Sequence, residues 1–406
     1  MRSSGPRRRQ AAILVCTLAI QAVGTAATLA FAVLAPLIPG ARTAEVGLFL
    51  ALVYGGAMVG SALSSALIGR LGAVRVSQAA LLFQGAGLAL LTADAGLAQT
   101  GAALLCGLGY GTITPASSHI LARTTAPQRM YTVFSLKQTG VPLGGMLGGA
   151  MLPVLAAWSS WRTALLLLAG LALAVALASG WLRAQLDEPA APRTAGMGQW
   201  RQPVVEVWRN AQLRAMAAVS LLFSACQLSV SGYLMVFLLR ELQMGAAGAA
   251  LIYAVSQAAG VLGRIVWGRI ADRTRAPRGV MMLIGVLMAL AALGLALLPA
   301  HPDPVVLAVL AAVLGATAIG WNGVFLGELA RLAPAGKVAS VTGGAMFFTY
   351  IGVVLGPPAF GYLAERASLG AAYGALAALP LIALLLLLLL LLLLGLRGRG
   401  PAARAG

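Results

Sequence analysis

Long apolar blocks separated by short polar stretches dominate the chain. Charged residues, prolines and glycines divide it into twelve blocks of about 20 residues or more, the length an α-helix needs to cross a hydrocarbon core about 30 Å thick. The pattern therefore predicts an all-α membrane protein with twelve transmembrane helices. The expected spans are 11–38, 45–68, 76–96, 101–122, 131–155, 162–182, 214–238, 246–269, 279–299, 305–329, 338–363 and 371–396.

Composition excludes the soluble multidomain protein that 406 residues would otherwise suggest. Hydrophobic residues make up 60% of the chain and charged residues only 9%, against about 25% charged residues in an average soluble domain. The net charge of +18 would fit a nucleic-acid binder, but the chain has no soluble domain that could present a basic surface. Cys16, Cys106 and Cys226 lie in apolar stretches and predict neither a disulfide framework nor a metal site. We expect a lipid bilayer as partner, and no nucleic acid, metal or cofactor.

The distribution of basic residues predicts the orientation in the membrane. With the amino terminus inside, 22 of the 28 basic residues fall in cytoplasmic segments and four in outer loops. Because positive charges favour the cytoplasmic side, both termini are expected there. The apolar run from Ala11 to about Pro39 is too long for the core of a cleaved signal peptide. The bias toward Arg and Ala indicates a GC-rich bacterial genome, and hence the bacterial inner membrane.

A hydrophilic segment divides the chain into two similar halves. We expect an amino-terminal six-helix bundle over residues 1–182, a cytoplasmic linker over 183–213 and a carboxyl-terminal bundle over 214–406. Gly69-Arg70-Leu71-Gly72 at the end of the second span has a counterpart in Gly268-Arg269-Ile270-Ala271-Asp272-Arg273 at the end of the eighth. Repeated halves with a binding site between them are typical of secondary transporters.

This organisation resembles the major facilitator superfamily over nearly the whole chain. The resemblance implies two pseudo-symmetric six-helix bundles and a basic loop after the second and eighth spans, with the pattern G-x-L-A-D-R-x-G-R-R. Gly268, Asp272, Arg273 and Arg275 match this pattern in the second copy. The first copy keeps Arg70, Gly72 and Arg75 but has Gly69 in place of the acid. The resemblance implies that Arg70, Arg75, Asp272 and Arg273 act in gating.

Two basic residues, Lys137 and Arg264, lie inside predicted spans. At 1.5 Å per residue, each lies about 10 Å inside the membrane. A charge at that depth is costly and is most often functional, although long basic side chains can also extend back to the interface. Lys137 shares a helical face with Gly140 and Gly144, and Arg264 shares one with Tyr253 and Gln257.

The resemblance also implies that the fifth and eighth helices meet beside a central cavity. Lys137 and Arg264 would then face each other without an acidic residue to neutralise them, and an anion would relieve their repulsion. The run from Gly263 to Gly268 resembles the arginine segment of monocarboxylate and oxalate porters. Monocarboxylate porters carry an acidic residue one turn before this arginine, and this chain has Gly260 at that position. The predicted substrate-binding residues are Lys137, Arg264, Gln21, Gln257, Asn322 and Tyr350.

Glu328 is the acid that the pattern places inside a span, three residues before Arg331. Its carboxylate is a candidate for proton coupling, and an ion pair with Arg331 or a loop arginine is the simpler interpretation. Gly140-Val141-Pro142 and Gly356-Pro357-Pro358 place glycine and proline in the middle of spans. Such positions allow close packing and bending, as expected of helices that rock between two states.

The sequence thus predicts a monomeric secondary transporter of a small organic anion, most simply a carboxylate, that works by alternating access with or without protons. A drug/proton antiporter is the alternative, because Gly140-Val141-Pro142 partly resembles the fifth-helix signature of such pumps. A receptor or scaffold that does not transport is a third reading. An enzyme is not expected, because the polar segments contain no nucleophile–base pair, nucleotide loop or metal spacing.

Overall fold

The computed structural model describes residues 6–38, 43–93, 96–187 and 201–398. Helices account for almost all of these residues, and no strand is assigned among them. Eleven of the described helical segments are long and apolar enough to cross a membrane. α4 (Gly96–Thr124) has the length of a span but carries many polar residues, and it is largely buried against α2 (Thr43–Leu71) and α3 (Ala73–Leu90). The prediction of twelve spans therefore holds only if α4 also crosses the membrane.

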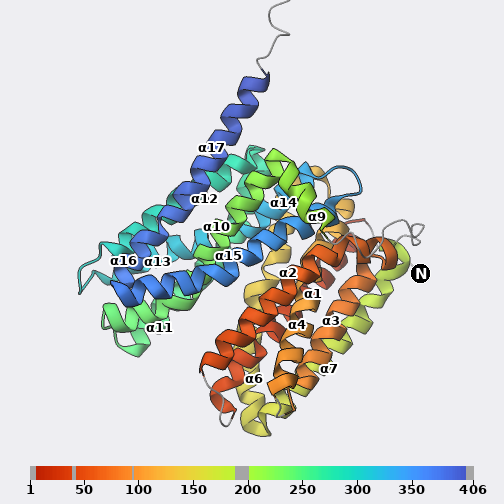
Figure 1. The fold of residues 1–406 in the computed structure, drawn as a ribbon, viewed down its shortest axis with the longest axis horizontal. Helices are drawn as coiled ribbons and strands as arrows, with labels where there is room; N and C mark the ends of the chain where they lie inside the picture. The colour runs from red at the N-terminus through yellow and green to blue at the C-terminus, as the bar shows by residue number, and fades with distance from the viewer. Residues whose placement is uncertain (1–5, 39–42, 94–95, 188–200, 399–406) are drawn as a thin grey trace, which may run out of the picture.

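The first group of helices comprises α1 to α7 (Figure 1). Most of its members pack mainly against one another, whereas α5 also makes extensive contacts with the second group. Besides α2, α3 and α4, the group contains α1 (Pro6–Leu34), α5 (Met130–Gln138), α6 (Gly140–Trp158) and α7 (Trp161–Ala178). A short helix, α8 (Arg183–Leu186), follows α7. We call this set the amino group.

The second group comprises α10 to α17 and has its own internal packing. Its members are α10 (Ala211–Val236), α11 (Ala246–Thr274), α12 (Pro277–Ala296), α13 (Pro304–Ala318), α14 (Asn322–Leu332), α15 (Val338–Arg366), α16 (Leu369–Leu376) and α17 (Ala378–Gly398). α10 continues into a π-helical turn over Phe237–Glu241. The helix α9 (Gln202–Arg209) precedes this set and packs against α15. We call α10 to α17 the carboxyl group.

The two groups meet at one end of the molecule and diverge toward the other (Figure 1). We call the meeting end the joined end; α2 and α11 end there, and α5 and α15 begin there. Two seams close it. In the α5 seam, α5 packs against α11 and α14, and in the α2 seam, α2 and α9 pack against α15.

Small residues make both seams possible. A Cβ atom at Gly323 of α14 would overlap Ser135 of α5, and a Cβ at Gly343 of α15 would overlap the carbonyl of Ser61 on α2. Helices that lack a hydrophobic driving force between them gain van der Waals contact by such close approach. Glycine at these positions therefore brings the two groups into direct backbone contact.

Two of the predicted spans are interrupted rather than continuous helices. The span predicted over 131–155 is broken at Thr139, between α5 and α6, and the span predicted over 305–329 is broken at residues 319–321, between α13 and α14. These breaks matter because they leave backbone carbonyls without their helical partners inside an apolar protein.

Candidate functional site

The first break frees the carbonyl of Gln138. In a continuous helix this oxygen would accept a hydrogen bond from the amide four residues later, but that residue is Pro142, which has no N–H. The carbonyl instead accepts a hydrogen bond from Nη1 of Arg264 on α11. A backbone group of the amino group is thereby bound by a side chain of the carboxyl group.

The second break supplies the other partner of Arg264. α13 ends at Ala318 and α14 begins at Asn322, so the carbonyl of Ile319 lies in the turn between them. Nε of Arg264 donates to this oxygen over 2.9 Å. One guanidinium therefore joins the two helix breaks, one in each group.

Lys137 lies next to this bridge, on the last turn of α5. Its Nζ donates to Oε1 of Gln21 over 2.6 Å and to Oε1 of Gln138 over 3.0 Å. Gln21 belongs to α1, and its Oε1 also accepts from Oγ1 of Thr114 on α4 over 3.4 Å. Gln138 thus contacts both cations, Lys137 through its side chain and Arg264 through its backbone.

The electrostatics of this cluster are unusual. Lys137 and Arg264 are each only 1% exposed, and each hydrogen-bond acceptor that the structure assigns them is a neutral amide or carbonyl oxygen. Burying charge without an opposite charge is costly even when hydrogen bonds are made. The centre of the molecule therefore holds two buried basic side chains whose assigned hydrogen-bond acceptors are all neutral.

Three tyrosines gather beside the cations. The rings of Tyr54 on α2, Tyr110 on α4 and Tyr350 on α15 form a triangle with centroid separations of 6.0 to 6.4 Å. Tyr110 lies next to Gln21 and Thr25 of α1. Tyr350, a predicted site residue, thus lies near the cations, together with two tyrosines that the sequence reading did not single out.

The other two predicted ligands lie apart from the cations. Nδ2 of Asn322 donates to Oε1 of Gln227 on α10 over 2.9 Å, and Nε1 of Trp321 donates to the same oxygen over 3.1 Å. Gln257 lies on α11 two turns from Arg264, beside Tyr253. Neither residue has a hydrogen bond to Lys137 or Arg264 among the contacts of the described residues.

The predicted gating residues lie at the joined end. Asp272 on the last turns of α11 accepts hydrogen bonds from the amides of Tyr131 (3.0 Å) and Thr132 (2.8 Å), at the start of α5. An acid at a helix N-terminus satisfies orphan amides and interacts favourably with the helix dipole. Arg70 lies in the last turn of α2, and Arg273 is exposed on the last turn of α11. Arg75 donates its amide to Asp187, beyond α8, over 3.2 Å.

Glu328 is fully buried in an ion-pair cluster beside the α5 seam. Its carboxylate accepts from Nε of Arg278 over 2.8 Å and from Nε of Arg331 over 2.7 Å. The hydroxyl of Tyr131 on α5 donates to it over 3.1 Å. Glu328 thus pairs with Arg331, its neighbour on α14, and with Arg278 at the start of α12.

The chain matches the sequence model of the Major Facilitator Superfamily over residues 14–351. The chain belongs to this superfamily. It is a multi-pass membrane transporter, and the superfamily consists generally of transporters rather than enzymes. A solved structure of a variant of the Escherichia coli fucose:proton symporter shares its fold, with a TM-score of 0.74 and 15% identity, covering 92% of this chain and 97% of the symporter. A second structure of a fucose transporter of the superfamily, in the outward conformation, gives a TM-score of 0.70.

Curated relatives match parts of this transporter at low identity. Monocarboxylate transporter 11 of Mus musculus is 28% identical over 280 residues, covering 66% of this chain and 60% of the relative. An MFS-type efflux pump of Mycolicibacterium smegmatis is 29% identical over 188 residues, covering 44% of this chain and 42% of the pump. The chain thus spans about half of the length of these relatives.

Two structural features of this transporter escaped the reading of its sequence. Gln138, which contacts both cations, has a sequence signal: Pro142 follows it by four residues and leaves its carbonyl free. Glu206 on α9 contacts the start of α15, and it lies in a segment that hydropathy marks only as polar.

Proposed function

We propose that this protein is a secondary transporter of a small organic anion that carries a carboxylate. The observation that carries the proposal is the buried pair Lys137 and Arg264, whose acceptors are all neutral. A carboxylate bound between them would replace weak neutral acceptors with a charged one, and charge-assisted hydrogen bonds are roughly twice as strong as neutral ones. Arg264 supplies a planar fork suited to the two oxygens of a carboxylate.

The proposed mechanism is alternating access about this pair. Lys137 belongs to the amino group and Arg264 to the carboxyl group, so rocking the groups changes the distance between the cations. With both termini in the cytoplasm of a bacterium and twelve spans in the inner membrane, the joined end is the cytoplasmic gate. The structure then represents an outward-facing state, in keeping with its likeness to a fucose transporter in the outward conformation.

Uptake into proteoliposomes tests the proposal. We expect saturable transport of carboxylates from a panel of monocarboxylates and dicarboxylates, and none of the uncharged amides of the same size. Lys137→Ala and Arg264→Ala should each lower carboxylate transport at least about 30-fold, because truncation of a buried charged partner costs about 2–5 kcal/mol. Arg366→Ala, which removes an exposed arginine at the opposite end of α15, is the matched control and should transport normally.

The same assay separates the alternatives. Transport of apolar cations against a proton gradient, without carboxylate transport, would support the drug/proton antiporter. Normal carboxylate transport by both central variants, at wild-type protein stability, would refute the assignment of the site. An imposed pH gradient in the same vesicles shows whether protons accompany the anion.

A further inference from the structure

The α2 seam lacks the acid that the α5 seam uses. In the α5 seam, Asp272 from the end of α11 binds the amides at the start of α5. The corresponding position at the end of α2 is Gly69, which is exposed, and a Cβ built there meets no atom within 4 Å. The start of α15, which the equivalent acid would approach, also has no side-chain cap, because Lys337 precedes it without one.

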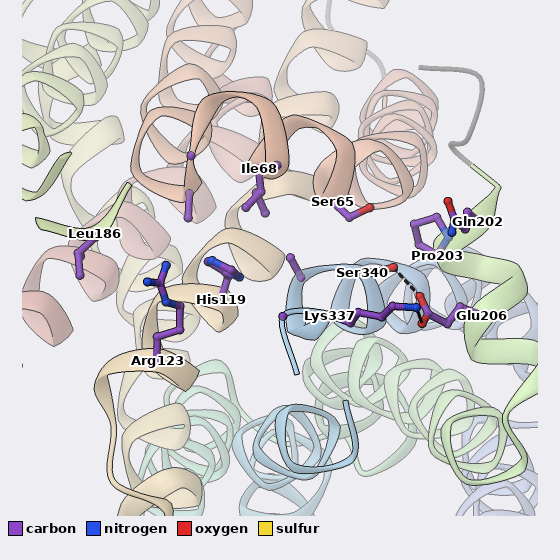
Figure 2. A pocket seen from close by; sticks show the side chains of 15 residues that line it. Ser65, Ile68, His119, Arg123, Leu186, Gln202, Pro203, Glu206, Lys337 and Ser340 are labelled. Carbon is purple, nitrogen blue, oxygen red and sulfur yellow. Dashed lines mark hydrogen bonds and ion pairs between the residues drawn. The ribbon is translucent and has the colours of Figure 1, made fainter. Parts of the chain in front are cut away.

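A carboxylate from the segment between the two groups approaches α15 instead. Oε1 of Glu206 on α9 accepts from Nζ of Lys337 over 2.8 Å, and Oε2 accepts from Oγ of Ser340 over 2.9 Å (Figure 2). Lys337 immediately precedes α15, and Ser340 is the third residue of this helix. The carboxylate is about four-fifths buried, with a side-chain exposure of 19%, and the lysine is 53% exposed.

The packing of α9 fixes this carboxylate in place. The carbonyl of Pro203 lies so close to Gly344 of α15 that a Cβ there would overlap it. Trp208 stacks on Phe348 of α15 with ring centroids 5.7 Å apart and planes 20° apart, and Val207 is fully buried. α9 therefore follows the first three turns of α15.

α9 also touches α2, so it lies across the seam. A cavity of about 270 Å³ separates the end of α2 from α9 and α15, and Gly69, Glu206 and Lys337 are among its lining residues (Figure 2). Gly69 borders this space, and a Cβ added there would have no atom within 4 Å. Because α9 contacts helices of both groups, part of its docking energy is available only when the groups are together at the joined end.

We propose that Glu206 is a positioning residue of the gate, and that α9 supplies from the connecting segment the carboxylate that α2 lacks. Glu206 holds α9 on α15, and α9 in turn stabilises the joined arrangement of α2 and α15. This role goes beyond the proposed function, because it concerns the resting balance between two conformations and does not depend on the identity of the cargo.

Pulsed EPR on the full-length transporter in nanodiscs, without substrate, tests this role. Spin labels replace Gln128 and Ala276, two exposed residues at the joined end on the side of the α5 seam, in a background with Cys16, Cys106 and Cys226 changed to Ala. Glu206→Gln should raise the ratio of separated to joined molecules about threefold, since pairs of this exposure contribute modestly. Ser340→Ala, which removes one of the two bonds, should raise it less. Glu365→Gln, an exposed acid at the far end of α15, is the control and should leave the ratio unchanged.

Restoring the acid on α2 distinguishes a gating role from a local one. Gly69→Asp has open space and should return the Glu206→Gln transporter toward the wild-type ratio. A separate variant that exchanges the charges, Glu206→Lys with Lys337→Glu, should have a ratio close to that of the wild type. The proposal would be overturned by an unchanged ratio in Glu206→Gln, or by a changed ratio that Gly69→Asp does not correct together with a changed ratio in the charge-exchanged variant. Because these measurements need no substrate, they stand apart from a failure of carboxylate transport.

Discussion

The two seams of the joined end occupy equivalent places in the two halves but are held by different chemistry. The α5 seam contains buried charge: Asp272 binds the start of α5, and Glu328 connects Arg278, Arg331 and Tyr131. The α2 seam combines backbone contact at Gly343 with a helix of the connecting segment. Repetition of the fold thus conserves the shape of an interface without conserving the interactions that stabilise it.

The difference coincides with the location of the proposed site. Arg264 bridges the two groups directly above the α5 seam, through the carbonyls of Gln138 and Ile319. In the α2 seam, Tyr54 and Tyr350 pack together farther from the joined end than Arg264 does. The cations, the ion-pair cluster and the helix breaks therefore all lie beside the α5 seam, where the proposed anion would act most directly on the contacts between the groups.

Glu328→Ala should have the largest effect, because it leaves Arg278 nearly buried without its counter-charge. Side-chain exposure is 12% for Arg278 and 0% for Glu328, and removing one partner of such a pair costs about 3–5 kcal/mol. We expect a lower melting temperature in detergent for this variant and no change for Glu365→Ala, which truncates an exposed acid. Equal melting temperatures would show that the carboxylate does not stabilise the α5 seam.

Gly323→Ala and Gly343→Ala should each destabilise the joined arrangement relative to the separated one. The expected free-energy change is about 1–3 kcal/mol, the usual cost of overpacking. The added methyl group overlaps Ser135 in one seam and Ser61 in the other, so both seams should respond alike to steric change. Spin-label distances across the joined end measure the shift. Gly170→Ala on α7 has open space and serves as control. A joined population equal to wild type in either variant would contradict the close approach at that seam.

Asp272→Ala and Glu206→Ala should destabilise the joined arrangement by different amounts, because the two carboxylates make different interactions. Asp272 accepts two backbone amides at a helix start, and loss of such a cap costs about 1 kcal/mol. Glu206 pairs with a half-exposed lysine, and pairs of that kind contribute about 0.2–1 kcal/mol. The populations measured by the same labels should therefore shift more for Asp272→Ala. The reverse order would mean that α9 is the dominant support of the joined end.

Hydropathy and charge placement predicted the all-helical membrane fold and the family, because these properties depend on composition over windows of 20 residues. The positions of Lys137 and Arg264 also followed from the sequence, since isolated charges in apolar spans are conspicuous. The hydrogen-bond partners of Lys137 and Arg264 did not follow from the sequence. The neutral oxygens that bind Arg264 come from two helix breaks, and only the packing between the groups brings these breaks together. Asn322 contacts Gln227 because of the way its helix is rotated about its axis, which the periodicity of the sequence does not determine.

Pro142→Ala gives the smallest expected effect. It tests whether the helix break at Thr139 is the reason that the α5 seam differs from the α2 seam. Alanine at this position restores an amide that can donate to the carbonyl of Gln138, the oxygen that Arg264 now binds. The restored helical bond competes with the guanidinium, so the link between the groups should weaken. We expect a small decrease in the joined population and about threefold tighter binding of a transported carboxylate, because a guanidinium that has lost a partner is more available to an anion.

Pro153→Ala is the matched control, since it restores an amide elsewhere in α6, one that would donate to Gly149 and not to an oxygen bound by Arg264. Isothermal titration with the carboxylate measures the affinity of both variants. If Pro142→Ala and Pro153→Ala bind the anion equally, the carbonyl of Gln138 does not compete with substrate, and Arg264 would serve the seam and the site independently. If only Pro142→Ala binds more tightly, the helix break beside Lys137 is what couples the α5 seam to the cargo, a coupling for which the α2 seam has no counterpart.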